Sequence, residues 1–273
     1  MKFAWAMRVA RWMALAALSS GLILADGAAG RATTAAGGWL PGRMAKLPRL
    51  TVWAWERRED LRGVDARTTA VAYLDRTVLV NGGVVRGVQI VPRRQSMLLP
   101  AAAGLVRIAV VRVEVGAGMA LDAVQADAVA GAIADAADGY EVAALQVDFD
   151  ARRSEREWYA EVLRRVRAKM PAGMPLSMTA LASWCSYDGA WMRGLPVDEA
   201  VPMLFRMEPD RRRDVVRGWG AGDFAVRQPM CAGSVGISTR EAWSPDMRAR
   251  RVYVFADRGW NRDGLAETVR SLQ

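Results

Sequence analysis

Apolar residues recur in short runs from about residue 50 onward, and polar segments separate these runs. Each run is rich in Val, Ile, Leu and aromatic residues and has the length of a strand, so we expect eight strands. The expected strands are residues 50–56, 69–75, 106–115, 142–150, 175–184, 199–207, 224–230 and 251–257.

Helical patterns lie between many of these runs, at residues 121–137, 154–169 and 211–219 and from Asp263 onward. Ser154 is followed three positions later by Glu157, which is the spacing of a capping box, so one helix should begin directly after the fourth strand. Strands that alternate with helices are typical of a parallel α/β sheet.

Eight such strands within residues 50–273 predict one α/β domain, an irregular (β/α)8 TIM-type barrel. The segment after the second strand, "DRTVLVNGGVVRGVQIVPRR", shows no helical pattern and predicts a β-hairpin that turns at Asn81-Gly82. An open doubly wound sheet is the alternative.

Residues 1–27 have the build of a secretory signal peptide, with Lys2, Arg8 and Arg11 before a short apolar run and small residues after it. Residues 28–49 are rich in Gly, Ala and Pro and predict a linker. We therefore expect an exported protein, periplasmic or extracellular; an uncleaved signal that anchors the chain is the alternative.

The chain carries a formal net charge of +9, with arginine clusters at residues 210–214 and 248–251. We interpret these arginines as solvated helix faces and expect no nucleic-acid partner, although peripheral contact with an anionic cell envelope fits the charge. The sequence leaves the oligomeric state open.

The absence of histidine excludes Ser-His-Asp and Cys-His catalysis and any His-containing zinc site. Cys185 and Cys231 are too few for a four-thiolate site; they either form one disulfide or remain two buried thiols. The chain has no phosphate loop and no dinucleotide fingerprint, so we expect neither a cofactor nor a metal, and catalysis would have to rest on carboxylates.

Side chains alternate across a strand, so Gln146, Asp148 and Asp150 should share one face of the fourth strand. The opposite face is apolar and should pack against helices, which directs the polar face into the barrel mouth, where barrel enzymes have their active sites. Asp148 and Asp150 are therefore catalytic candidates. A structural network in which Arg112 holds the two carboxylates is the alternative.

Other candidates follow strand ends in the same way. Glu56 and Glu114 are further catalytic carboxylates that could pair with Asp150, and indole rings, a carboxylate and a guanidinium near the same rim suit a sugar. The candidate substrate-binding residues are Trp53, Trp55, Asp75, Trp184, Arg206 and Trp260.

Several separated motifs resemble a bacterial family catalogued as domain of unknown function 3142. They are "VWAWERREDLRG", "VQIVPR", "LQVDFDARRSEREWYAEVLRRVR", "SMTALASWC" and "DEAVPMLFRM". This resemblance implies no established activity.

The chain also distantly resembles glycoside-hydrolase-like barrels, particularly the family 18 chitinases and their inactive relatives. Those place the pattern D-x-x-D-x-D-x-E at the end of the fourth strand, and Asp148 and Asp150 match its second and third aspartates. Leu145 replaces the first aspartate and Arg152 replaces the catalytic glutamate, so another carboxylate would have to supply the proton.

These observations predict an exported glycoside-hydrolase-like barrel that acts on an envelope or extracellular polysaccharide through carboxylates at strand ends. The alternative is a noncatalytic glycan-binding protein or an envelope scaffold, which the arginine at position 152 favours.

Overall fold

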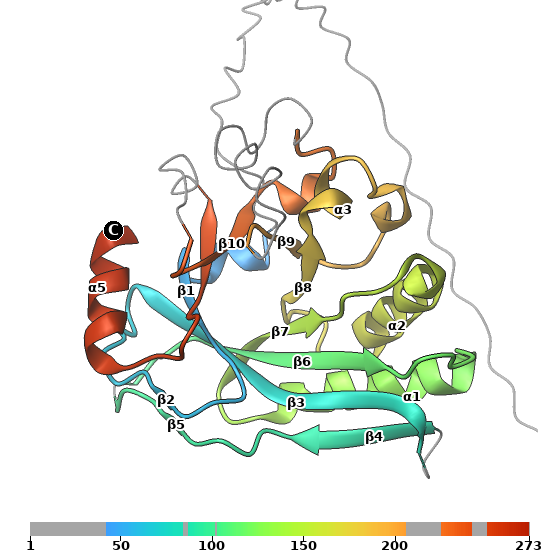
Figure 1. Ribbon diagram of the computed structural model, residues 1–273, viewed down its shortest axis with the longest axis horizontal. Helices are drawn as coiled ribbons and strands as arrows, with labels where there is room; N and C mark the ends of the chain where they lie inside the picture. The colour runs from blue at the N-terminus through green and yellow to red at the C-terminus, as the bar shows by residue number, and fades with distance from the viewer. Residues whose placement is uncertain (1–41, 84–86, 102, 206–224, 242–249, 273) are drawn as a thin grey trace, which may run out of the picture. The chain divides into compact units, whose positions relative to one another are not determined.

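Eight parallel strands close into a barrel, as the sequence predicted (Figure 1). The computed structural model describes residues 42–83, 87–101, 103–205, 225–241 and 250–272, which all belong to one compact unit. β1 pairs in parallel with both β3 and β11, and this closes the ring. The barrel strands are β1 (Leu50–Ala54), β3 (Thr69–Gly83), β6 (Arg107–Val115), β7 (Val142–Asp148), β8 (Leu176–Leu181), β9 (Glu199–Met203), β10 (Ser234–Ser238) and β11 (Arg251–Phe255).

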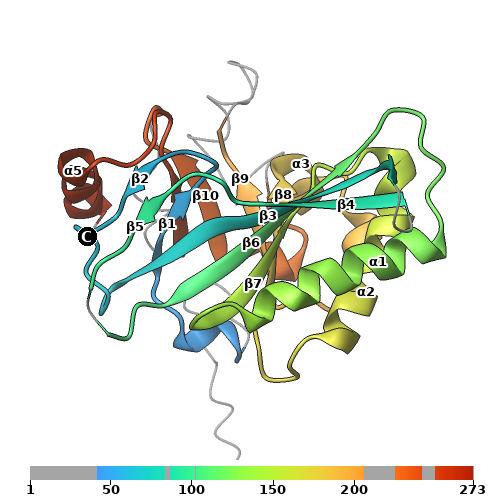
Figure 2. The ribbon, with the colours of Figure 1, turned by 90° about the horizontal axis from the view of Figure 1, so that it is seen from below.

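Helices and short turns connect the strands and cover the outside of the barrel. Two helices, α1 and α2, lie side by side, with α1 against β3 and β7, and α5 lies at the far end of the molecule (Figure 2). The described helices and turns are η1 (Met44–Lys46), α1 (Ala123–Ala134), η2 (Asp135–Asp138), η3 (Arg153–Glu155), α2 (Arg156–Lys169), α3 (Ala182–Ser186), η4 (Ala190–Met192), η6 (Pro229–Cys231) and α5 (Arg262–Leu272).

The irregular part of the barrel is the predicted hairpin. β3 continues beyond the barrel and pairs antiparallel with β4 (Gly87–Pro92), while β2 (Glu59–Asp60) and β5 (Met97–Leu98) form a small separate sheet. The hairpin is confirmed, but β3 runs through Asn81-Gly82 to Gly83, so the turn lies later than predicted. The register shifts between Val80 and Gly83, and Gly82 there adopts a φ of 77°, a conformation that glycine tolerates.

The predicted position of the seventh strand was wrong. The seventh strand is Ser234–Ser238, not residues 224–230, because the amides of Arg227 and Gln228 donate to the carbonyl of Cys185 instead of joining the sheet. The chain then turns through η6, which begins at Pro229. The helix predicted at residues 211–219 and the signal peptide lie outside the described residues.

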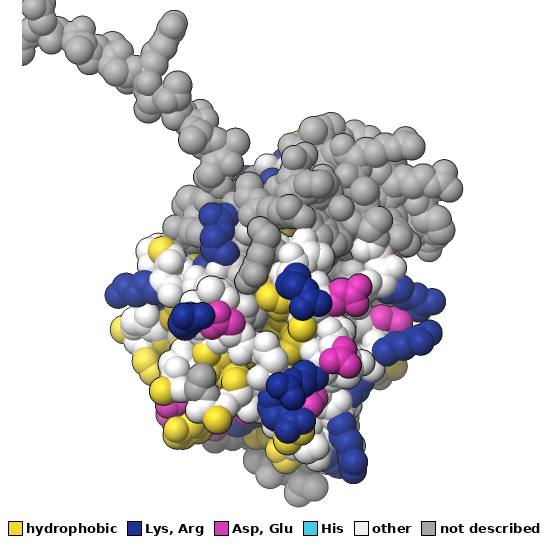
Figure 3. Space-filling model, turned by 90° about the vertical axis from the view of Figure 1, so that its left-hand side faces the viewer, with side chains coloured by type: hydrophobic (Ala, Val, Ile, Leu, Met, Phe, Trp, Pro, Cys, Tyr) yellow, Lys and Arg dark blue, Asp and Glu magenta, His cyan; other side chains and the backbone are white. Residues whose placement is uncertain are grey.

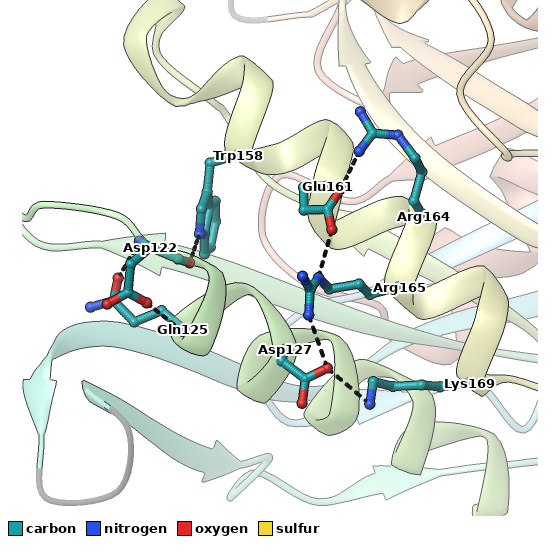
Figure 4. Close-up of polar contacts among 8 residues, drawn as sticks. All are labelled: Asp122, Gln125, Asp127, Trp158, Glu161, Arg164, Arg165 and Lys169. Atoms are coloured by element: carbon teal, nitrogen blue, oxygen red, sulfur yellow. Dashed lines mark hydrogen bonds and ion pairs between the residues drawn. The ribbon is translucent and has the colours of Figure 1, made fainter.

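The capping prediction at Ser154 was also wrong. Glu155 occupies the N-cap of α2, and its carboxylate accepts a hydrogen bond from the amide of Arg152 at 2.7 Å. A capping box does occur at α1, where Asp122 and Gln125 bond each other's backbone amides at 2.8 and 3.0 Å (Figure 4).

Polar side chains join α1 to α2 along their exposed edge (Figure 4). The indole of Trp158 donates to the carbonyl of Asp122 at 3.0 Å. Further along, Asp127 accepts ion pairs from Arg165 at 3.3 Å and from Lys169 at 3.1 Å. Such exposed pairs contribute little individually, so the buried apolar surface between the helices and the barrel holds this layer in place.

Alternation along β7 separates its two faces as the sequence predicted. Leu145, Val147 and Phe149 are buried with the side chains of α1 and α2, whereas Gln146 and Asp148 point into the barrel. The interior of the barrel is therefore partly polar.

The N-terminal end of the barrel is sealed by the last residues of the predicted linker. Arg251 is fully buried, pairs with Glu199 at 3.2 Å and donates to the carbonyls of Met44, Leu47 and Pro48. Arg251 belongs to the cluster 248–251 that was interpreted as solvated, and this interpretation is wrong for that residue. Burial raises the pKa of Glu199, and Arg251, Tyr253 and Ser177 oppose that shift.

Elsewhere the basic side chains are distributed over the surface. Figure 3 shows Lys and Arg spread over one face, with Asp and Glu among them and hydrophobic side chains between. Local ion pairs such as Arg62–Asp60 at 2.7 Å and Arg67–Asp65 at 3.1 Å account for part of this mixture.

Cys185 and Cys231 form a disulfide, which resolves the alternative that the sequence left open. It links the segment after β8 to the segment before β10, across a sequence separation of 46. Both cysteines are fully buried in the main core.

Replacing both cysteines by serine should lower the free energy of unfolding by about 2 to 5 kcal/mol, because the cross-link restricts the unfolded chain. Urea unfolding of the wild type and of C185S/C231S, each with and without dithiothreitol, measures this. The reductant should destabilise only the wild type; equal sensitivity of both proteins would contradict the prediction.

Candidate functional site

A pocket of about 630 Å³ opens at the carboxyl ends of the barrel strands. Its walls combine aromatic rings, arginines and carboxylates that come from six of the eight barrel strands or the residues just after them. The described lining residues are Trp53, Trp55, Arg57, Arg112, Asp148, Asp150, Leu181, Met203, Phe205, Ser238, Arg240, Glu241, Phe255, Ala256 and Asp257.

Asp148, the last residue of β7, is a buried carboxylate with two partners. Arg112 on β6 donates to it at 2.9 Å, and Thr179 on β8 donates at 2.8 Å. Arg112 and Asp148 are register partners on neighbouring strands, so the sheet itself brings the two charges together. The structure thus shows for Asp148 the network that the sequence offered as an alternative.

Arg112 is shared between two carboxylates, since its Nε also donates to Glu114 at 2.7 Å. Burial disfavours the charged guanidinium, but Asp148 and Glu114 outweigh burial and raise the pKa of Arg112. The guanidinium also lies over the ring of Trp55, 5.2 Å from its centroid. Arg112 is therefore held from three sides.

Asp150 differs from Asp148 because it lies beyond the end of β7 and lines the pocket with an exposed side chain. None of the described residues donates a hydrogen bond to its carboxylate or forms an ion pair with it. Partial burial raises the pKa of Asp150, the charge of Asp148 raises it further, and Arg112 opposes both effects. A carboxyl group in this setting can hold a proton at higher pH than an ordinary aspartate.

Four aromatic rings that line the pocket contact one another in a row. Trp55 stacks on Trp53 with centroids 4.8 Å apart, and Phe255 lies 4.7 Å beyond Trp53. Phe205 continues the row, 4.8 Å from Phe255. These four side chains, with Arg112 at one end, give the pocket an amphipathic wall.

Two of the predicted carboxylates lie elsewhere. Glu56 accepts hydrogen bonds from the amides of Arg94 and Gln95 at 3.0 and 2.8 Å, so it holds a loop and is not among the described lining residues. Glu114 bonds Arg112 on the exposed end of β6, next to the pocket but not lining it.

Asp75 is on the outer face of β3. Its carboxylate pairs with Arg76 at 2.5 Å, and Arg76 in turn donates to a carbonyl of α1. The inner face of β3 carries Ala70 and Ala72, which lie against Trp53. The structure therefore does not bring Asp75 to the pocket.

Trp184 and Trp260 are buried away from the pocket. Trp184 lies on α3 and packs edge-on against Trp191, with centroids 5.0 Å apart. The indole of Trp260 donates to the carbonyl of Trp53 at 2.9 Å and so fixes the end of β1. Arg206 lies outside the described residues.

Several lining residues were not predicted from the sequence. Phe255 and Asp257 end the run at residues 251–257, and Arg57 follows the first strand, so the rule that active-site residues follow barrel strands would have found them. Phe205 ends the run after β9 in the same way. Arg240 and Glu241 follow the true seventh strand, which was predicted at the wrong place.

Position 152 carries an arginine with an exposed side chain, 63 % accessible, whose guanidinium lies 3.6 Å from Glu155. Glu155 is buried and bonds the amide of Arg152, so neither residue contributes an acid to the described pocket wall.

Among the described residues, no group of three or more His, Cys, Asp or Glu side chains is arranged to hold a metal ion.

Comparison with known proteins supports the fold. The family model described as "Domain of unknown function (DUF3142)" matches residues 103–201. The structure is similar to that of a presumed Chitinase A from Streptomyces coelicolor, with a TM-score of 0.51 and 15% identity over 82% of this chain and 96% of that one. At this identity the likeness shows a chitinase-like TIM barrel fold and nothing finer. No curated protein matches the chain in sequence.

Weaker likenesses involve two spore proteins. One is the spore cortex-lytic enzyme SleL of Bacillus cereus, with a TM-score of 0.43 and 16% identity over 69% of this chain and 51% of that one. The other is the chitinase domain of the spore coat protein CotE of Clostridium difficile, with a TM-score of 0.40 and 13% identity over 60% of this chain and 53% of that one.

Replacing Arg112 by methionine should lower the free energy of unfolding by about 3 kcal/mol, because it leaves Asp148 buried without its cation. Urea unfolding at neutral pH measures the loss. Arg164→Met is the control, since Arg164 pairs with Glu161 on the exposed face of α2 and should contribute below about 1 kcal/mol. The double variant R112M/D148N should recover part of the loss; equal losses in R112M and R164M would contradict the role of the pair.

Replacing Asp150 by asparagine should raise the melting temperature at neutral pH. The rise should be small, on the order of 1 °C, because solvent screens the charge of an exposed group. The unfolded chain ionises at its ordinary pKa, whereas the folded chain keeps the proton to higher pH, so stability falls as pH rises through the raised pKa. The advantage of the variant should therefore disappear as pH is lowered below about 4. Calorimetry between pH 7 and about pH 4 measures the two melting temperatures. Asp138→Asn is the control, because Asp138 is an exposed aspartate at the end of η2. An Asp150→Asn variant that melts below the wild type at neutral pH would contradict the prediction.

Proposed function

We propose that this protein is an exported, glycoside-hydrolase-like barrel protein that binds an envelope or extracellular polysaccharide in the pocket and cleaves it. The observation that carries the proposal is Asp150, an unpaired carboxyl group with a raised pKa in a large pocket at the carboxyl end of the barrel. The likeness to a structure named as a chitinase supports the same class of reaction.

Cleavage of a glycosidic bond needs a proton for the leaving oxygen and a group that attacks or assists at the anomeric carbon. Asp150 serves as the acid, because its raised pKa retains the proton, and the charge of Asp148 tunes it. Asp257 lines the same pocket at the end of β11, with Arg240 3.6 Å away, and provides the second carboxylate.

Recognition of the sugar rests on the aromatic row and the arginines that border it. Sugars combine apolar faces with polar edges, and rings beside charged groups suit both. Trp55, Phe205 and Phe255 remain partly accessible in the pocket, and Arg57 and Arg240 provide hydrogen-bond donors at its rim.

A noncatalytic glycan-binding protein is the second candidate, and Arg152 is the observation that favours it. The position that carries the acid in family 18 chitinases holds an exposed cation here, while Asp148 is fully committed to Arg112 and Thr179. This candidate keeps the pocket and its aromatic row but lacks turnover.

Export is supported by the disulfide, since such bonds persist in oxidising compartments. Among the described residues, no helix is long and apolar enough to cross a membrane. The net charge of +9 further favours contact with anionic polymers of the envelope.

The proposal is tested with protein from about residue 31 onward, incubated with bacterial and plant polysaccharides and assayed for new reducing ends. We expect turnover that falls by about 100-fold or more in Asp150→Asn and that declines as pH rises through the pKa of Asp150, because the acid is then ionised. Asp138→Asn should retain full activity.

Binding is measured in parallel by calorimetry on the same panel. Binding without turnover in the wild type would replace the enzyme by the glycan-binding candidate. A folded protein that neither binds nor cleaves any member of the panel would overturn both.

A further inference from the structure

A chain of buried hydrogen bonds runs through the barrel interior up to the floor of the pocket. Glu199 on β9 accepts from Arg251, Tyr253 and Ser177 at 3.2, 2.7 and 3.2 Å. Ser177 on β8 in turn accepts from the amide nitrogen of Gln146 at 3.1 Å. All of these side chains are almost completely inaccessible to solvent.

The chain ends at Trp53. The amide oxygen of Gln146 accepts the hydrogen bond of the Trp53 indole at 2.8 Å, and both groups are buried. Gln146, Ser177 and Glu199 are register partners on three adjacent strands, so the sheet places them in one layer beneath Asp148. Gln146 is the member of this layer that reaches across the barrel to β1.

Trp53 is the centre of the aromatic row, because it contacts both Trp55 and Phe255. Small residues surround it on β3, where its direct register partner is Ala72. The indole of Trp53 is buried between Trp55 and Phe255, and its hydrogen bond to Gln146 fixes the side of the ring that carries the nitrogen.

We propose that Gln146 is a positioning residue of the pocket: by accepting the indole hydrogen of Trp53 it fixes the ring that Trp55 and Phe255 both contact. This inference rests on the proposed function, since it treats the aromatic wall as the surface that contacts the sugar. Glutamine suits the position because its amide accepts from Trp53 and donates to Ser177 at the same time.

The hydrogen bond itself is tested without any ligand. In a spectrum of 15N-labelled indole groups, the Trp53 signal is the one that Trp53→Phe removes. Gln146→Leu should shift this signal upfield and speed its exchange with solvent. Thr51→Val is the matched control, because Thr51 lies on the same strand, is fully buried, and has a hydroxyl that bonds none of the described residues.

The positioning role is tested by binding of the N-acetylglucosamine hexamer and of the glucose hexamer to the same variants. We expect Gln146→Leu and Trp53→Phe each to weaken binding of the better probe by about fivefold or more. The double variant should be no weaker than the poorer single variant, because both substitutions remove one interaction. Thr51→Val should bind like the wild type.

Four results would overturn the inference. The first is an unchanged indole signal in Gln146→Leu. The second is a shifted signal with unchanged binding, and the third is losses that multiply in the double variant; in both cases the wild type binds a probe and the proposed function survives. The fourth is a wild type that binds neither probe; if it also neither binds nor cleaves any polysaccharide of the panel, the proposed function fails together with the role of Gln146.

Discussion

A charged side chain that points into a closed barrel needs a partner inside the barrel, and this constraint organises the molecule. An unpaired buried carboxylate or guanidinium is costly, and the inward-facing charges of the described residues are held in two networks. Glu199 pairs with Arg251 in the lower layer, and Asp148 pairs with Arg112 and Thr179 in the upper one. Arg251 also binds the carbonyls of residues 44–48, so the same network closes the bottom of the barrel.

The candidate site lies where the networks of paired interior charges end. The ladder between β7 and its neighbours ends at Asp148, and Asp150 lies two residues beyond it, on the same side of the chain but outside the network. None of the described residues bonds or pairs with it; the nearby Asp148 carboxylate raises its pKa, and Arg112 opposes this effect. The proposed function therefore takes its acid from Asp150, which lines the pocket outside the network.

The sequence predicted the architecture because hydrophobic alternation and helical periodicity are local signals. It located both faces of β7, the hairpin and most strands. It assigned the wrong face of β3 to the interior when it placed Asp75 at the pocket; Ala70 and Ala72 face inward instead, because they leave room for the bulk of Trp53.

The other misplaced residues have similar causes. Residues 224–230 have the composition of a strand, but the carbonyl of Cys185 captures the amides of Arg227 and Gln228, and the disulfide holds this segment beside α3. Arg251 was interpreted as a surface residue because its cluster is basic, yet a buried glutamate fifty-two positions away in the chain pairs with it. Such long-range partners leave no local signal.

The chitinase-like fold does not by itself decide between catalysis and binding, because barrels of this class keep their scaffold while their strand-end residues vary. Arg152 stands where family 18 chitinases have their acid, and its exposed side chain is not among the described residues that line the pocket. The network around Asp148 still shapes the site, and the charge of Asp148 still raises the pKa of Asp150. The same interior pairing that stabilises the barrel thus supplies the conditions under which one remaining aspartate could act as an acid.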